Sequence, residues 1–403
     1  MNIFSILSAF RGITIGLFSP IWILYLNEQG FDLLAIGILG AIFEIARLVF
    51  EIPSGTLADK MGVKRTILYS YICSIAVWLF FPFIHMVWVS VLLMLVWALA
   101  DSLLSGTFET WISQSVPEKH FSKKLMKNSQ ILIVALILSS IISGHLYKYS
   151  PFLPFILVAG IYAIMFFIVL LYSNKGITIS QNKEKDHTQE PAIQIIKNSF
   201  AIIFSTRRIF SIIIAGFFAA LCYDVIMRYW QPYLIQIGAS KEFLGYAMAV
   251  AGILAFLFLH LTIKLNKFIE RKTILSLIVV EILSIAFIFS TAIGLKSLGL
   301  IAITFLLAVD DIRSPIINGY LNKFFPSSYK ATLFSINSFF GAAGEILSGI
   351  LFGLIAIKFG ILNSFIVAGI LLIPSIFLYY NASKNKKIEL ERDDLITEEK
   401  DAI

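Results

Sequence analysis

The stretch SGTLADKMGVKRT, residues 54–66, lies between two long apolar runs. It brings together four charged side chains, Asp59, Lys60, Lys64 and Arg65, and two glycines, Gly55 and Gly62. Glycines next to charged residues favour a turn in contact with water. This stretch is therefore expected to be a polar turn that connects two apolar segments, and the nature of those segments decides the fold class.

The composition of the whole chain excludes an ordinary soluble fold. Its 403 residues are 58% hydrophobic and 14% charged, with a mean hydropathy of +0.87. A soluble chain of this length needs a larger polar surface to cover its core. The net charge of +7 would suggest nucleic acid in a soluble protein. Basic cytoplasmic loops of a membrane protein explain it here, and we expect no nucleic-acid partner.

Apolar runs of about 20 residues, the length that spans a bilayer as a helix, recur along nearly the entire chain. They are continuous rather than alternating, which favours helices over a β-barrel. We predict an all-α membrane protein of twelve transmembrane helices. The predicted spans are residues 3–27, 32–54, 66–87, 89–115, 124–147, 151–173, 207–236, 241–264, 272–294, 297–322, 328–357 and 359–381.

Basic residues gather in alternate loops. They follow the second, fourth, eighth and tenth spans and recur in the segment between the sixth and seventh. The loops on the opposite side carry few basic residues, namely Lys148, Lys241, Lys296 and Lys358. By the positive-inside rule both termini are cytoplasmic, which agrees with an even number of spans.

Weak internal repeats divide the chain into two halves. VKRTIL at 63–68 resembles ERKTIL at 270–275, and Asp101 and Asp310 stand at nearly the same offset. We therefore predict two pseudo-symmetric six-helix bundles. The predicted divisions are an N-terminal bundle at 1–173, a cytoplasmic interdomain loop at 174–206, a C-terminal bundle at 207–381 and a cytoplasmic tail at 382–403.

The interdomain loop begins with a polar stretch, 174–191, which we expect to be flexible. It then places Ile193, Ile196, Phe200 and Ile203 at helical spacing. This pattern predicts an amphipathic helix on the cytoplasmic face of the membrane.

Ionisable residues also lie inside the predicted spans, where a charge costs about 2.5–3.5 kcal/mol or more. They are Arg11, Glu44, Arg47, Glu51, Asp101, Glu109, Asp224, Arg228, Glu281, Asp310, Asp311, Arg313 and Glu345. Such groups are expected to face the bundle interior or a wet cavity. We predict that all of them except Arg11 and Glu51 line a proton-coupling or substrate cavity, since the deepest ones come from both halves.

Nine of these residues are acids and four are arginines, so pairing cannot neutralise every carboxylate. Burial favours the protonated form of a carboxyl group. The excess therefore favours proton coupling, a cationic or zwitterionic substrate, or both. A structural role stays open for Asp224 with Arg228, which lie four residues apart on one helix. It also stays open for Arg313, which could pair with Asp310 or with a neighbouring helix.

Other patterns predict packing and exclude several functions. GITIG at 12–16 and GILFG at 349–353 place small residues four apart, as close helix packing requires. Aromatic residues near the embedded charges are candidates for a cavity wall or for core positions, namely Tyr223, Tyr229, Trp230, Phe108 and Trp111. The chain has no Walker A sequence, no Cys/His set with metal-ligand spacing and no visible nucleophile–base set. We therefore expect neither ATP-driven transport, nor a metal site, nor an enzyme.

GTLADKMGVKR at 55–65 resembles the loop between helices 2 and 3 of the major facilitator superfamily, whose pattern is roughly G-x-L-A-D-[RK]-x-G-x-[RK]-[RK]. Every defining position of that pattern is filled. FEIARLVFEIPSG at 43–55, SGTFETW at 105–111 and RYWQPYL at 228–234 resemble a drug-exporting branch that includes tetracycline and macrolide efflux proteins. The fourth span departs from the superfamily, because it carries acids where an arginine is common.

The resemblance implies rocker-switch alternating access, in which two halves rock about a central cavity and the 55–65 loop latches the cytoplasmic side. In that role Gly55 permits another helix to approach, and Gly62 permits the tight turn. Asp59 accepts hydrogen bonds from a helix N-terminus or pairs with a cation. The basic residues Lys60, Lys64 and Arg65 complete the gating loop, and the last two anchor it at the anionic membrane surface.

We therefore predict a secondary active transporter in the lipid bilayer of a bacterial cytoplasmic membrane. It is expected to be a monomer that exports amphiphilic drugs, cationic or zwitterionic, in exchange for protons. The proton gradient is the expected energy source, and no cofactor is expected. The first alternative is a transporter of a metabolite, such as a sugar, peptide or amino acid, on the same fold. The second is a transporter-like sensor.

Overall fold

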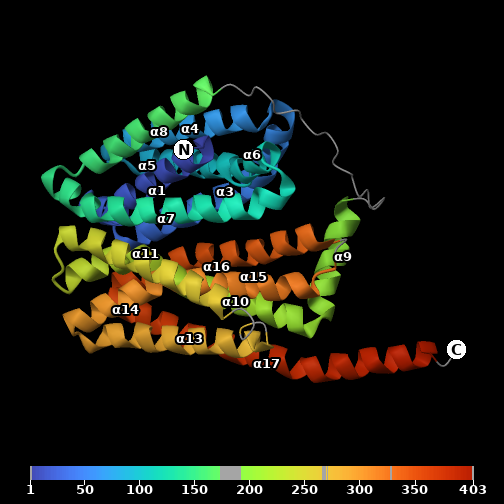
Figure 1. Cartoon of the computed structure of the whole chain (residues 1–403). Helices are drawn as coiled ribbons and strands as arrows, with labels where there is room; N and C mark the ends of the chain where they lie inside the picture. The colour runs from blue at the N-terminus through green and yellow to red at the C-terminus, as the bar shows by residue number, and fades with distance from the viewer. Residues whose placement is uncertain (1, 173–191, 266–268, 270, 327–328, 402–403) are drawn as a thin grey trace.

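The computed structural model describes residues 2–172, 192–265, 269, 271–326 and 329–401. Within these ranges the regular secondary structure is helical, which confirms the predicted all-α class. The predicted flexible stretch 174–191 lies outside the described residues. Figure 1 shows two groups of helices, one from each half of the chain, lying side by side.

The first half of the chain forms the blue-to-green upper group in Figure 1. Its helices are α1 (Ile3–Phe18), α2 (Trp22–Glu28), α3 (Leu33–Met61), α4 (Val63–Phe80), the 3-10 turn η1 (Phe81–Phe83), α5 (Val87–Leu104), α6 (Thr107–Ser115), α7 (Glu118–Tyr149) and α8 (Leu153–Leu171). Two predicted spans are each split into two helices. Pro20 lies between α1 and α2 and lacks the N–H of a continuous helix. Gly106, with a φ of +68°, lies between α5 and α6.

The second half forms the lower group in Figure 1. Its helices are α9 (Ala192–Ser205), α10 (Arg207–Gln236), α11 (Lys241–Lys264), α13 (Thr273–Ser290), the 3-10 turn η2 (Thr291–Ile293), α14 (Lys296–Ala308), α15 (Asp310–Phe324), α16 (Lys330–Phe359) and α17 (Ile361–Asp401). In the described chain, eleven helical stretches are long and apolar enough to cross a membrane. The tenth predicted span is shared by α14 and α15, which meet at Val309. Eleven of the predicted spans thus correspond to these stretches, and the tenth corresponds to the two shorter helices α14 and α15.

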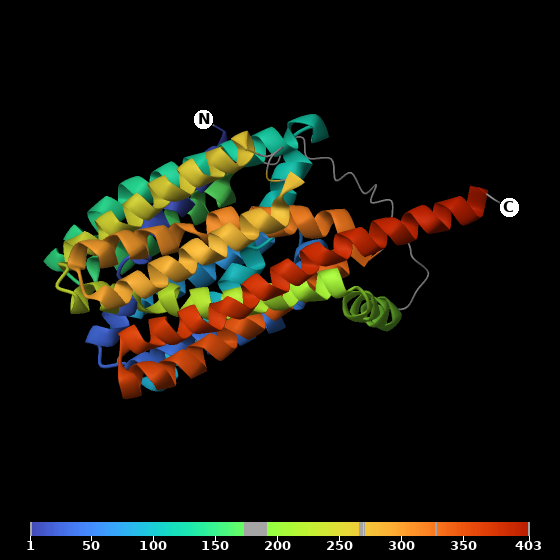
Figure 2. The same ribbon diagram turned by 90° about the horizontal axis from the view of Figure 1, so that it is seen from below.

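Several helix ends differ from the predicted limits, and two of these differences concern the predicted loop and tail. Helix α3 continues to Met61, so most of the expected loop at 55–65 is helical and the turn is confined to Gly62. Helix α17 continues to Asp401, beyond the predicted end of the last span at 381 (Figure 2). Its C-terminal part is rich in Lys, Glu and Leu, which are good helix formers.

Helix α9 occupies the position of the predicted amphipathic helix. Ile203 is fully buried in the second half, and Phe200 packs beside it. Ile193 and Ile196 are exposed on the outer side. The helix is therefore held by its C-terminal part, and its contact with a membrane surface stays a prediction.

The bundle has two distinct ends. We call the end that carries the connections at 28–33, 149–153, 236–241, 293–296 and 359–361 the closed end. We call the end that carries residues 54–66 the motif end. The closed end lies to the left in Figure 1, where α7 and α11 lie against one another.

Hydrophobic packing joins the halves near the closed end and separates them near the motif end. One large core takes side chains from both halves, among them Tyr25 and Trp230. Toward the motif end, Trp111 belongs to a core built from the first half alone. Leu333 belongs to another core built from the second half alone. The two halves thus share apolar packing over only part of their length.

Glycines bring the helix backbones of the two halves together at the closed end. A Cβ atom on Gly37 of α3 would overlap the carbonyl oxygen of Gly349 of α16, and the reverse holds for Gly349. Gly12 of α1 lies equally close to the backbone of α7 within the first half. The close packing predicted for 12–16 and 349–353 is confirmed.

Polar contacts reinforce the closed end. Lys241 binds Glu28 across the halves, with 2.6 Å between Nζ and Oε1, and Lys148 forms an ion pair with Glu242. Each half thus contributes one acid and one lysine. In addition, the buried side chain of Gln231 accepts a hydrogen bond from the Leu24 amide (2.9 Å) and donates one to the Ser19 carbonyl (2.7 Å).

Candidate functional site

A cavity of about 170 Å³ lies where the two halves meet in the middle of the bundle. It takes its walls from α2, α3 and α5 of the first half and from α10 of the second. The lining residues are Trp22, Gly40, Phe43, Glu44, Met94, Trp97, Asp224, Met227 and Arg228. Three of the predicted site residues, Glu44, Asp224 and Arg228, therefore face one space.

Arg47 connects the acids of the two halves. Its guanidinium binds Glu44 on the same helix, with 2.6 Å between Nη2 and Oε2. It also reaches Glu345 of α16, at 3.9 Å between Nη2 and Oε2. Asp101 of α5 lies within electrostatic range of Arg47, and the neighbouring Ser102 hydroxyl donates to the Arg47 carbonyl oxygen (3.4 Å). The site therefore extends from α5 across α3 to α16.

Arg228 of α10 joins an acid of its own helix to the backbone of the other half. Its Nε and Nη2 donate to both carboxylate oxygens of Asp224, at 3.0 and 2.7 Å. This is the intrahelical pair that the four-residue spacing suggested. Its Nη1 also donates to the carbonyl oxygen of Gly37 in the first half, at 3.4 Å. The pair thus lies at the cavity and at the interface between the halves.

The charges of this cluster do not balance. Glu44, Asp224 and Glu345 supply three carboxyl groups, whereas Arg47 and Arg228 supply two guanidinium groups. Glu44 and Asp224 each have a close arginine partner, whereas the contact of Glu345 with an arginine is the longest of the three. A proton or a cationic ligand would neutralise the remaining charge.

Aromatic side chains form part of the wall of the same cavity. The ring of Trp97 lies 5.3 Å from that of Trp22, edge to face, and 5.1 Å from that of Phe43. Cation–π attraction and apolar contact make such a wall suitable for an organic cation. Residues 22, 43 and 97 were missed by sequence reasoning, although Phe43 adjoins Glu44 and Trp97 precedes Asp101 by one helical turn.

The aromatic residues proposed from the sequence lie elsewhere. Phe108 and Trp111 belong to the core of the first half at the motif end. Tyr229 donates a hydrogen bond to the Leu33 carbonyl oxygen (2.7 Å), and Trp230 is part of the shared core. Proximity to a charge along the chain therefore does not place a side chain in the cavity.

A second polar cluster is confined to the second half. Tyr223 of α10 donates a hydrogen bond to Glu281 of α13, at 2.7 Å. Arg313 of α15 lies over the Tyr223 ring, 5.2 Å from its centroid, and binds Asp310 at 2.8 Å. Arg313 thus pairs with its local acid. Glu281, Asp310 and Arg313 do not line the cavity between the halves.

Two further predicted site residues stand apart from both clusters. Asp311 is exposed beside Asp310. Glu109 lies in the first turn of α6 and does not line the cavity. In the described chain, no group of three His, Cys, Asp or Glu side chains is placed to hold a metal ion.

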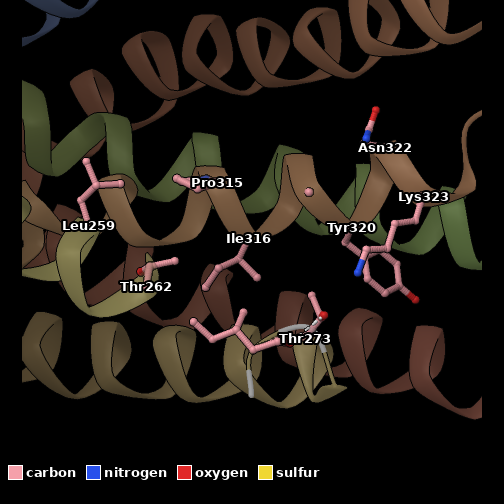
Figure 3. Close-up of a pocket in the computed structure, with 10 residues that line it drawn as sticks. Leu259, Thr262, Thr273, Pro315, Ile316, Tyr320, Asn322 and Lys323 are labelled. Atoms are coloured by element: carbon pink, nitrogen blue, oxygen red, sulfur yellow. Dashed lines mark hydrogen bonds between the residues drawn. The ribbon is translucent and has the colours of Figure 1, made fainter. Parts of the chain in front are cut away.

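A larger cavity, of about 540 Å³, lies inside the second half between α11, α13 and α15 (Figure 3). Leu259, Ile316, Tyr320 and Asn322 are among its lining residues. None of the predicted site acids lines it. We therefore assign the functional site to the smaller, charged cavity between the halves.

The residues of the predicted gating loop are arranged around the turn between α3 and α4. Gly62 has a φ of +84°, which favours glycine, as expected for the tight turn. The Lys64 ammonium donates to the Leu170 and Tyr172 carbonyl oxygens at the end of α8, at 3.1 and 2.7 Å. It therefore ties the turn to its own half, whereas anchoring at a membrane surface was expected.

The other residues of this turn face outward. Lys60, Asp59 and Arg65 are exposed. A Cβ atom on Gly55 would meet no atom within 4 Å, so the expected helix approach is not made in this arrangement. In the described part of the chain the Asp59 carboxylate has no hydrogen-bond or ion-pair partner.

Two helical halves around a charged cavity define a class of membrane transporter. A model of the Major Facilitator Superfamily matches residues 4–309. The chain is 45% identical over 400 residues to the uncharacterized MFS-type transporter YxaM of Bacillus subtilis (strain 168), covering 98% of this chain and 100% of that one. It is 24% identical over 357 residues to the quinolone resistance protein NorA of Staphylococcus aureus (strain MRSA252), covering 87% and 88%.

Among solved structures, that of the nucleoside transporter NupG superposes with a TM-score of 0.77 at 14% identity, covering 95% of this chain and 100% of that one. At this identity the likeness concerns the fold alone. The chain belongs to the Major Facilitator Superfamily. It is a multi-pass membrane transporter rather than an enzyme, and the predicted resemblance to the drug-exporting members is confirmed by the NorA match.

Proposed function

We propose that this chain exports amphiphilic organic cations or zwitterions in exchange for protons. The observation that carries the proposal is the excess of carboxyl over guanidinium groups in the cluster of Glu44, Arg47, Asp224, Arg228 and Glu345. A proton and a cation can each restore the balance, so they can compete for one site. The aromatic wall supports an organic cation rather than a hydrated metal ion.

The proposed orientation has both termini and the motif end in the cytoplasm of a bacterium. The distribution of basic loops supports it. The separate cores at the motif end support a state in which substrate enters from that side. Export then requires the motif end to close and the opposite end to open, with the protein acting as a monomer.

Glu345 is the proposed proton acceptor. Its contact with Arg47 is 3.9 Å, whereas Glu44 and Asp224 are held at 2.6 and 2.7 Å by their arginines. The carboxylate with the weakest partner gains most from binding a proton. The proton gradient supplies the energy, and no cofactor takes part. The similarity to NorA, which is named for quinolone resistance, supports the export of drugs.

Proteoliposomes test this proposal. Ethidium added to liposomes that contain the wild-type protein should cause proton movement, detected with a trapped pH-sensitive dye. Glu345→Gln should bind ethidium without moving protons. Glu109→Gln, which alters an acid outside the cavity, is the control and should retain both properties. If Glu345→Gln and Asp224→Asn both keep full coupling, the proposed proton exchange is wrong.

A metabolite transporter is the second candidate. The Arg47 side chain is partly exposed, and its guanidinium could bind the carboxylate of a zwitterion such as an amino acid or peptide. A drug-susceptibility panel in an efflux-deficient host separates the two functions. Export predicts raised inhibitory concentrations for cationic drugs, whereas unchanged values together with nutrient uptake favour the metabolite transporter.

A further inference from the structure

Gly40 and Arg228 face each other across the interface between the halves. A Cβ atom on Gly40 would overlap Nη1 of Arg228 and would approach Nη2 to 2.8 Å. The guanidinium therefore occupies the space that a side chain at position 40 would fill. Both residues line the central cavity. The arrangement depends on a glycine at this position of α3.

The Arg228 guanidinium, which lies against Gly40, makes two kinds of contact. It binds both carboxylate oxygens of Asp224 and also donates to the carbonyl oxygen of Gly37 in the other half. The contact with Asp224 neutralises the carboxylate of α10 that lines the cavity. The second joins α10 to α3 beside the backbone contact of Gly37 with Gly349, which belongs to the closed end. Moving one side chain would therefore free an acid and weaken the closed end together.

We propose that Arg228, seated on Gly40, is a built-in competitor for the cation site: an organic cation gains Asp224 by displacing the guanidinium, and this displacement loosens the closed end. The inference rests on the proposed export of cations for its ligand class. Gly40 acts as a positioning residue, because it makes room for Arg228 without touching the ligand. Substrate binding and opening of the closed end would then be linked through one arginine.

Gly40→Ala tests the proposal in the full-length protein. The methyl group should push the guanidinium away from Asp224, so tetraphenylphosphonium should bind about tenfold more tightly. Gly160→Ala is the control, since a Cβ atom at this helical position of α8 meets no atom within 4 Å. Binding to purified protein in detergent is measured by isothermal titration calorimetry.

A double-mutant cycle separates displacement from simple filling of the cavity. Arg228→Ala should tighten tetraphenylphosphonium binding to a similar extent, and Gly40→Ala should then add little in that background. Equal effects of Gly40→Ala with and without Arg228 would overturn the proposal, because the methyl group would then act on the ligand directly. Weaker binding by Gly40→Ala in the wild-type background would overturn it as well.

A second readout needs no ligand. Spin labels at the exposed positions Tyr149 and Leu295 report the distance between the halves at the closed end. Gly40→Ala should enlarge the fraction of molecules with a long distance, and Gly160→Ala should not. An unchanged distribution in Gly40→Ala would overturn the link to the closed end. If wild-type protein fails to bind tetraphenylphosphonium, the proposed function fails for this cation, and the distance measurement still decides the role of Gly40.

Discussion

The closed end and the motif end belong to the same helices but differ in what joins the two halves. At the closed end a shared hydrophobic core, backbone contact between Gly37 and Gly349, and the hydrogen bonds of Gln231 all cross the interface. At the motif end each half has its own core. A bundle joined chiefly at one end can rock about its middle, where Arg47 meets Glu345.

This difference also explains the state of the motif. Its turn is complete, because Gly62 has the required backbone conformation and Lys64 ties it to α8. Its proposed latch is idle, because Asp59 is exposed and Gly55 faces open space. A latch residue needs a partner only when its end of the bundle is closed. We therefore expect Asp59 and Gly55 to make their contacts in the state in which the motif end is closed, rather than in the structure described here.

The largest effect is expected from enlarging the glycine contact at the closed end. In Gly349→Val the side chain would overlap the backbone of Gly37, so α3 and α16 could not approach. Transport of ethidium in vesicles should fall at least about tenfold, since a blocked contact of this kind costs more than 1.4 kcal/mol. Gly341→Val, on the same helix with open space around it, is the control. Equal loss in both variants would show that the effect is not specific to the contact.

A smaller effect is expected from the buried amide at the same end. Gln231→Leu leaves the Leu24 N–H and the Ser19 carbonyl without this partner, which costs about 1–3 kcal/mol. The midpoint of thermal unfolding in detergent should fall by a few degrees. Gln29→Leu, at the same end of the bundle, should leave the midpoint nearly unchanged. An unaltered midpoint in Gln231→Leu would show that the amide does not stabilise the interface.

The ion pairs of the closed end should matter less, because their side chains are partly exposed. Glu242→Lys places two lysines opposite each other and should favour opening by up to about 1 kcal/mol, less at high salt. Adding Lys148→Glu restores an opposite-charge pair and should restore the wild-type distribution of distances between Tyr149 and Leu295. Failure of the exchange to restore it would argue against a direct pair.

The smallest effect is expected at the motif end. Lys64→Met removes a contact within the first half and should lower the free energy of unfolding by about 1 kcal/mol or less. The distance across the closed end should not change, since no contact between the halves is lost. Lys60→Met, at an exposed neighbouring position, is the control. A changed distance at the closed end in Lys64→Met would contradict the separation of the two ends.

Much of the fold could be predicted from the sequence, because the length of an apolar run and the charge of the loops that flank it are local properties. The predicted spans 207–236 and 241–264 coincide with α10 and α11. The breaks near Pro20 and at Val309 were not predicted, since apolar composition continues across both. Hydropathy indicates whether a segment lies in an apolar environment, but it does not indicate where the backbone hydrogen bonds of a helix are interrupted.

The candidate site was only partly predictable. Embedded acids stand out because charge is costly in a membrane, and this cost identified Glu44, Asp224 and Glu345. Their grouping depends on which helices adjoin, which the sequence does not state. Trp22 and Trp97 could not be identified in this way, because an aromatic side chain can face lipid, the protein core or a cavity. The wall of the cavity therefore required the structure.

The most direct test of the account is to measure both ends of the bundle in one protein. Spin labels at Tyr149 and Leu295 report the closed end, and labels at Met126 and Asn322 report the motif end, in a background whose native cysteines are replaced by alanine. On addition of tetraphenylphosphonium, the first distance should lengthen while the second shortens. Parallel changes at both ends, or bound ligand with no change at either end, would contradict rocking of the two halves about the central site.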